Sequence, residues 1–261
     1  MDHVVVFGAG ARRRPAVLGG AFSPLGWAVG FVEAPHKAVV EALLAWRRDL
    51  GADLDVVDVL PAWPGCLQNL DPLESPWTTE LLVPHAERWT AYLNNHVNGR
   101  DPWPVSSYLA RVLRTRWVIA EHQPMTRHGH ASTQLWLGGS DGQPPLGYLR
   151  TITAHAGDGR WAWETSGPVQ PFEQPDAYRA RKISDRFPRR LLVDYLHALG
   201  IAVDDDQQYG NAVLVRQRVT WPRRTLTLDK AGHEIDAPAL HHRSGGLCRR
   251  PQRRVRHPLA S

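Results

Sequence analysis

Between Gly147 and Trp221, hydrophobic and polar residues follow a pattern that predicts a hairpin, a helix and a strand in that order. Two runs rich in β-forming residues, Leu149 to Thr153 and Trp161 to Glu164, flank a Gly-Asp-Gly tripeptide at 157–159. Glycine and aspartate tolerate the positive φ of tight connections, so the tripeptide predicts a hairpin turn. Residues 211–218 supply the strand that follows the helix.

The helix of this region is predicted from Asp176 to Leu199, where apolar residues recur at helical spacing and Gly200 follows as a C-cap. Pro188 removes one backbone donor inside it, so we expect a kink or two consecutive helices meeting there. Its polar positions carry an excess of positive charge. They include Arg179, Arg181, Lys182, Arg186, Arg189 and Arg190. Such charge is most often a solvated helix face, and the alternative is a contact surface for an acidic protein or nucleic acid.

The pattern near the N-terminus predicts a strand that begins near Trp27, a helix from Ala34 to Leu50 and a strand over residues 54–60. Pro35 suits the first helical turn, and Gly51 closes the helix. A long loop interrupted by prolines follows the second strand. Loops of that length inside a compact domain are often functional.

Residues 78–122 and 147–221 show the same order of elements, which is hairpin, polar loop, helix and strand. Residues 134–138 add one strand between them. The hairpins and the tryptophans in them predict an α+β fold, with a mainly antiparallel, Trp-rich sheet and helices packed on one side. The repeated order also raises the hypothesis of two similar halves.

We expect three regions along the chain. An N-terminal arm covers residues 1–24, the α+β domain covers 25–228, and a disordered basic tail covers 229–261. The hydrophobic fraction of 43% is ample for a core. Much of the net charge of +5 comes from arginines of the tail. These are Arg243, Arg249, Arg250, Arg253, Arg254 and Arg256.

The cysteine content favours a cytoplasmic location, because Cys66 and Cys248 lie too far apart to predict a disulfide framework or a zinc site. Arginine greatly outnumbers lysine, as is typical of a high-GC bacterial genome, so arginine content is weak evidence for nucleic-acid binding. The three arginines at 12–14 precede an uncharged run at 16–32 that superficially resembles an export signal. Its prolines and glycines make it a poor helix, too short and broken to span a membrane.

The sequence lacks the motifs of acyl transfer, phosphoryl transfer and zinc proteases, and we expect no cofactor. Glu164, Glu173 and His155 are the candidates for acid/base catalysis if an enzymatic site is present. His122, His128 and His130 are weak candidates for metal ligands. The acidic run Asp204-Asp205-Asp206 is more typical of a solvent-exposed loop than of a metal site.

Trp63, Trp77 and Trp103 stand in Pro-rich stretches, where tryptophan serves either as a binding residue or as a cover for the core. With the basic residues Arg179, Lys182, Arg186, Arg189 and Arg190, they are the candidate binding residues. We therefore predict a non-catalytic, regulatory or immunity-type protein that binds another protein. The alternatives are an enzyme with an unfamiliar carboxylate and histidine site, and weak, salt-sensitive nucleic-acid binding through the basic helix and tail.

Overall fold

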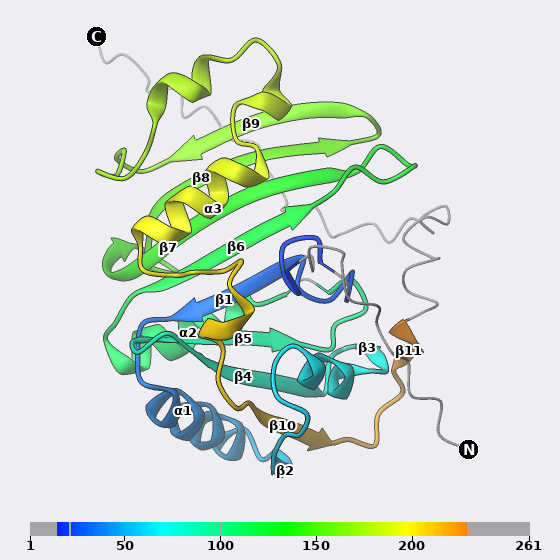
Figure 1. The fold of residues 1–261 in the computed structure, drawn as a ribbon. Coiled ribbons are helices and arrows are strands. Elements are labelled where there is room, and N and C mark those ends of the chain that lie inside the picture. Colours follow the sequence, from blue (N-terminus) through cyan, green and yellow to red (C-terminus); the bar gives the residue numbers. More distant parts are fainter. Residues whose placement is uncertain (1–14, 21, 100, 229–261) are drawn as a thin grey trace, which may run out of the picture.

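A computed structural model describes residues 15–20, 22–99 and 101–228. These residues form a mixed α+β fold around a nine-stranded sheet with the order β2-β10-β4-β5-β1-β6-β7-β8-β9, in which every neighbouring pair is antiparallel (Figure 1). A second sheet pairs β3 with β11. The strands of the large sheet are β1 (Ala28–Val32), β2 (Asp53–Asp58), β4 (Thr79–His85), β5 (Trp89–Asn94), β6 (Trp117–Gln123), β7 (Ala131–Gln143), β8 (Tyr148–Gly157), β9 (Arg160–Ser166) and β10 (Val213–Arg218).

The small sheet consists of β3 (Leu73–Ser75) and β11 (Arg224–Leu226). The α-helices of the described residues are α1 (His36–Asp49), α2 (Trp103–Leu113) and α3 (Arg189–Ala198). The 3-10 helices are η1 (Gly65–Leu70), η2 (Pro175–Arg179), η3 (Ile183–Asp185) and η4 (Asp206–Gln208).

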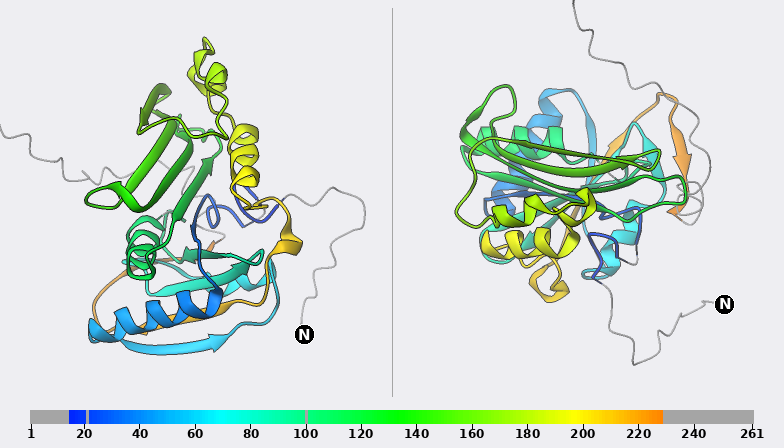
Figure 2. Two further views of the ribbon diagram at one scale, coloured as in Figure 1. Left: turned by 90° about the vertical axis from the view of Figure 1, so that its left-hand side faces the viewer. Right: turned by 90° about the horizontal axis from the view of Figure 1, so that it is seen from above.

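Both faces of the large sheet are covered, so the prediction that the helices pack on one side is wrong. In β6, Val118 and Ala120 join a core with α3 and η1, whereas Trp117 and Ile119 join a second core with α1 and α2. Figure 2 shows α1 and α2 on one side of the sheet and α3 on the other. The reason is that the central strands β5 and β6 are buried at every position except His122, and such strands need apolar cover on both faces.

The two regions with the same element order do not pack alike. Helices α2 and α3 lie on opposite faces. Strand β6, which ends the first region, pairs with β1 and β7, whereas β10, which ends the second, crosses the sheet to lie between β2 and β4. The structure therefore does not confirm two similar halves.

Part of the segment expected as an N-terminal arm belongs to the core. Ala16, Val17 and Leu18 are buried on the α3 side of the sheet, and the Leu18 amide donates to the Gly26 carbonyl at 2.6 Å. This apolar run covers core side chains that would otherwise face water. Its own burial explains why it packs as part of the domain. Residues 1–14 and the predicted basic tail, 229–261, lie outside the described residues.

The local predictions between β8 and α3 are confirmed for the hairpin and for the break at Pro188, but the α-helix covers only Arg189–Ala198. Asp158 and Gly159 have φ of 51° and 75° and form the two-residue hairpin turn. The predicted helix from Asp176 to Leu199 is divided into η2, η3 and α3. Pro188 is the N-cap of α3 in an extended conformation with ψ of 161°, so the chain turns there instead of continuing as one helix.

Candidate functional site

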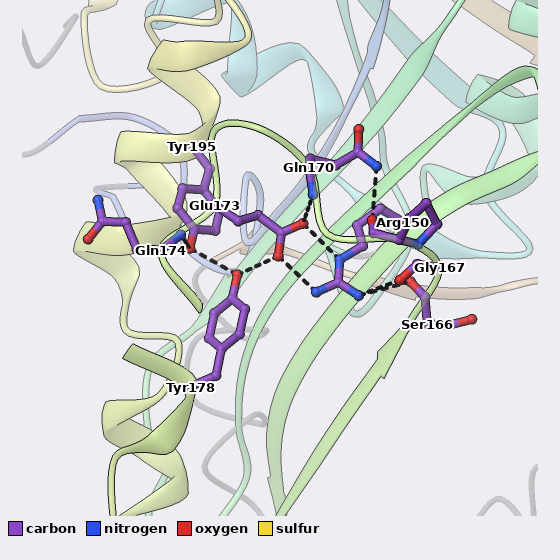
Figure 3. Close-up of polar contacts among 9 residues, drawn as sticks. Arg150, Ser166, Gly167, Gln170, Glu173, Gln174, Tyr178 and Tyr195 are labelled. Carbon is purple, nitrogen blue, oxygen red and sulfur yellow. Dashed lines mark hydrogen bonds and ion pairs between the residues drawn. The ribbon is translucent and has the colours of Figure 1, made fainter. Parts of the chain in front are cut away.

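The segment between β9 and α3, residues 167–188, is held against the sheet by a buried ion pair (Figure 3). Arg150 on β8 donates from Nε and Nη2 to both carboxylate oxygens of Glu173, each at 2.8 Å. The two side chains are only 4% and 0% exposed. Arg150 also donates to the Gly167 carbonyl at 2.8 Å, and Glu173 accepts from the Gln170 amide at 2.7 Å. The two charges therefore compensate each other, and the same side chains bind the backbone of the segment at Gly167 and Gln170.

Two tyrosines extend this network to α3. The Tyr178 hydroxyl donates to Glu173 at 2.8 Å and lies 2.9 Å from the hydroxyl of Tyr195, which accepts from the Gln174 amide at 2.7 Å. Burial raises the pKa of Tyr178, and its bonds to Tyr195 and Glu173 raise it further, so this hydroxyl stays protonated and can donate. Glu173, a candidate acid/base residue, thus serves as the centre of a structural network.

We call residues 179–190, which follow Glu173 and lead into α3, the cationic segment. Two of its predicted binding residues turn inward. Arg186 Nε donates to the Ala180 carbonyl at 2.9 Å, and Arg189 Nε donates to the Leu18 carbonyl at 2.8 Å. Arg179 forms an exposed pair with Asp176 at 3.3 Å.

The remaining cations of this segment point into solvent. Arg181, Lys182 and Arg190 are exposed and form no ion pair with any described residue. Arg189 and Arg190 also occupy the first turn of α3, which holds no acid. The helix dipole makes that end partially positive, so cations there are unfavourable for stability. The segment therefore presents positive charge on a fixed backbone where helix stability alone would select acids.

The three acid/base candidates are not brought together. Glu164 and His155 are diagonal neighbours on the α2 side of β8 and β9, because Glu164 opposes Thr153 and His155 opposes Ala162. Glu164 is exposed. Glu173 and Arg150 lie on the α3 side, where Arg150 shares a face with the core residue Ile152. The sheet therefore separates Glu173 from the other two residues.

The histidines predicted as metal ligands do not form a metal-binding group, and no such group of three His, Cys, Asp or Glu occurs among residues 15–20, 22–99 and 101–228. His122 lies on β6, with Nδ1 3.0 Å from the Thr133 hydroxyl. Burial, together with the Arg189 charge, lowers its pKa to about 4. His128 and His130 lie in the connection from β6 to β7, where the Nε2 of His128 accepts from Arg127 at 3.2 Å.

The three acids at 204–206 have separate structural roles. Asp204 contacts His197 at 2.6 Å. Asp205 caps η4 by accepting from the Gln207 amide at 3.0 Å. Asp206 accepts from the Trp63 indole at 2.9 Å. The three carboxylates therefore bond to three different partners.

The candidate binding tryptophans pack against the cores. Trp63 is 9% exposed and stacks on Tyr209 with ring centroids 4.1 Å apart. Trp77 and Trp103 are partly buried against the core on the α1 and α2 side. Trp103 meets Trp136 edge to face at 5.7 Å. These positions give all three tryptophans a packing role.

Sequence reasoning missed a buried histidine beside the 204–206 loop. His85, at the end of β4, is fully buried between Phe31 and Tyr209, with ring centroids at 5.6 and 4.3 Å. Neither ring nitrogen has a hydrogen-bond partner among the described residues. Burial lowers the pKa of His85 to about 4, opposed only in part by the Asp205 charge. A lone histidine after an apolar strand gives no sequence signal for this environment.

Acid should weaken the fold through His85. Its pKa is lower in the folded protein than the ordinary 6.5, so its contribution is complete above that pH and is lost as the pH falls toward about 4. The loss from this residue should reach about 3 kcal/mol, because each pKa unit is worth about 1.4 kcal/mol. Urea unfolding at several pH values between 7 and 4 measures it.

The test variant is His85→Phe, which keeps a ring in the aromatic cluster and removes the titratable group. It should flatten the dependence of unfolding free energy on pH relative to wild type. An identical pH dependence of wild type and His85→Phe would refute this role of His85.

Comparison of the chain with protein-family models, curated proteins and solved structures gives no match. Within the described part of the chain, none of the helices combines the length and apolar character needed to cross a bilayer. The fold and contacts define an α+β protein with a core on each face of its sheet and a cationic segment that follows a buried ion pair.

Proposed function

We propose that the protein acts by binding an acidic partner protein through the cationic segment, without catalysing a reaction on it. The observation that carries the proposal is a group of three exposed cations, Arg181, Lys182 and Arg190, that form no ion pair with any described residue. The backbone just before them is anchored by the buried Arg150–Glu173 pair and by Tyr178, which bonds to Glu173. A preordered segment loses less conformational entropy on binding than a mobile one.

The placement of charge distinguishes this binding surface from an ordinary solvated helix face. An exposed helix selected for stability alone favours acids at its N-terminus, whereas α3 begins with two arginines. Positive charge at such a position speeds association with a negative surface and helps to select the partner. A binding function would explain why arginines stand at the α3 N-terminus although they lower the stability of the helix.

Charge reversal of the segment should abolish partner binding without harming the fold. In the variant Arg181→Glu/Lys182→Glu/Arg190→Glu, an acidic partner that copurifies with tagged wild-type chain from its native host should be lost. Because Arg190→Glu removes an unfavourable charge from the α3 N-terminus, that single change should raise the unfolding free energy by about 0.3–1 kcal/mol. Quantitative mass spectrometry and urea unfolding provide the two measurements.

The matched control is Arg48→Glu/Arg114→Glu/Arg127→Glu, which reverses three exposed arginines outside the segment. It should keep the same copurifying protein. Equal recovery with both triple variants, or no copurifying protein, would contradict the proposal. If random duplex DNA binds wild type and loses affinity only with the cationic-segment variant, the partner is a nucleic acid instead.

A further inference from the structure

At the far end of the sheet from the cationic segment, a cleft of about 370 Å³ lies between the β2–β10–β4 strands and the chain that runs from η1 into β3. Figure 1 shows β3 and β11 beside this end of the sheet. The lining side chains are almost all polar or charged. Among them are Asp55, Asn69, Asp71, Glu74, Arg216 and Arg223.

The inner wall of the cleft is a closed hydrogen-bond network. Glu74 is buried and accepts from Arg223 Nε at 2.5 Å and from the Thr78 hydroxyl. Burial alone would raise the pKa of Glu74, but the bonds from Arg223 and Thr78 outweigh it and lower that pKa. Asn95 accepts from the Thr78 and Thr79 amides at 3.0 and 2.9 Å. The polar groups of this wall already have partners, so the wall limits the shape of the cleft and offers no free charge to a ligand.

The outer wall carries two side chains of opposite charge that do not form an ion pair with each other. Arg216 on β10 lies directly opposite Asp55 on β2, and residues so placed share a face of the sheet. Both line the cleft, yet they form no ion pair with each other or with any other described residue. The next pair on the same strands, Arg218 and Asp53, does approach to 3.7 Å. The guanidinium and the carboxylate beside the cleft thus keep their hydrogen-bonding capacity.

The size and charge of the cleft restrict what it can hold. Its volume is near the lower end of the about 300–1,000 Å³ typical of small-molecule sites. A guanidinium binds a carboxylate with two parallel hydrogen bonds, and a carboxylate accepts from an ammonium group. A simple anion would satisfy Arg216 but meet repulsion from Asp55. A ligand with both charges a few bonds apart satisfies both side chains.

We propose that this cleft binds a small zwitterion of the free amino-acid type, with its carboxylate on Arg216 and its ammonium group on Asp55. This site is separate from the cationic segment and does not depend on the function proposed for it. The fixed inner wall of Glu74, Thr78 and Asn95 limits the length of the ligand side chain.

The test uses the full chain with the twenty standard L-amino acids, each as a separate probe, and with acetate, methylamine and inorganic phosphate. At least one amino acid should bind saturably in calorimetry with a Kd of about 1 mM or tighter. It should also shift the side-chain amide signals of Asn69 and Asn95 in NMR spectra. Arg216→Gln and Asp55→Asn should each weaken binding by about tenfold or more, the loss expected for one charge-assisted contact.

The control variants are Lys37→Gln and Glu41→Gln, which alter an exposed pair on α1 outside the cleft and should leave the Kd within about twofold. All four variants change exposed or half-exposed side chains, and unchanged thermal unfolding shows that they fold. Saturable binding of phosphate or acetate that survives Asp55→Asn would overturn the zwitterion assignment. Absence of saturable binding by every amino acid would overturn the site itself.

Discussion

Glu173→Ala should lower the free energy of unfolding by about 3–5 kcal/mol, the usual cost of leaving one partner of a buried ion pair uncompensated. The Arg150 side chain, which is 4% exposed in the intact pair, would lose its carboxylate partner, and the Tyr178 hydroxyl would lose an acceptor. Urea unfolding measures the global loss. Hydrogen exchange should also show faster opening of residues 167–182.

Glu164→Ala is the matched control, because Glu164 is an exposed carboxylate on the adjacent strand and its loss should cost about 0.5 kcal/mol or less. The double variant Arg150→Met/Glu173→Leu should be more stable than Glu173→Ala, since it leaves no unpaired buried charge. A Glu173→Ala protein as stable as Glu164→Ala would show that the pair does not anchor the segment.

The second large effect is expected from Glu80→Ala, on the opposite face of the sheet. Glu80 is fully buried on β4 and receives two hydrogen bonds from Arg47 of α1, at 2.9 and 2.6 Å. It also accepts from the Tyr92 hydroxyl at 2.8 Å. Its removal should lower the free energy of unfolding by about 3–5 kcal/mol, because the buried Arg47 charge would lose its partner. It should also loosen the contact of α1 with the sheet.

Glu41→Ala provides the comparison for this second prediction. Glu41 lies on α1 but pairs with Lys37 in solvent at 3.9 Å, and exposed pairs of this kind contribute about 0–1 kcal/mol. Protection of the α1 amides against hydrogen exchange should fall in Glu80→Ala and persist in Glu41→Ala. Equal protection in the two variants would mean that apolar packing alone holds α1.

The local elements of the fold were predictable, because their signals are contained in a few adjacent residues. The Gly-Asp-Gly turn at 157–159 and the break at Pro188 follow from the backbone preferences of those residues. The two-sided cover was predictable in principle, since Trp117 to Ala120 is a continuous apolar run and such runs indicate strands covered on both faces.

The buried networks could not be predicted from the sequence, because each joins residues with no local relation. Arg47 and Glu80 are 33 positions apart, and Arg150 and Glu173 are 23 positions apart. In a single sequence such residues look like ordinary surface charges. The grouping of basic residues at 179–190 was visible, but their division into inward and outward side chains depends on where Pro188 turns the chain.

The position of β10 between β2 and β4 has a consequence for synthesis of the chain on the ribosome. Strand β2 has β10 as its one neighbour in the described sheet, so it stays unpaired until residues 213–218 have emerged. Until then β2 and β4 both expose open backbone edges, which are sites of aggregation. A nascent chain stalled after α3 should therefore depend on chaperones far more than one released after β10.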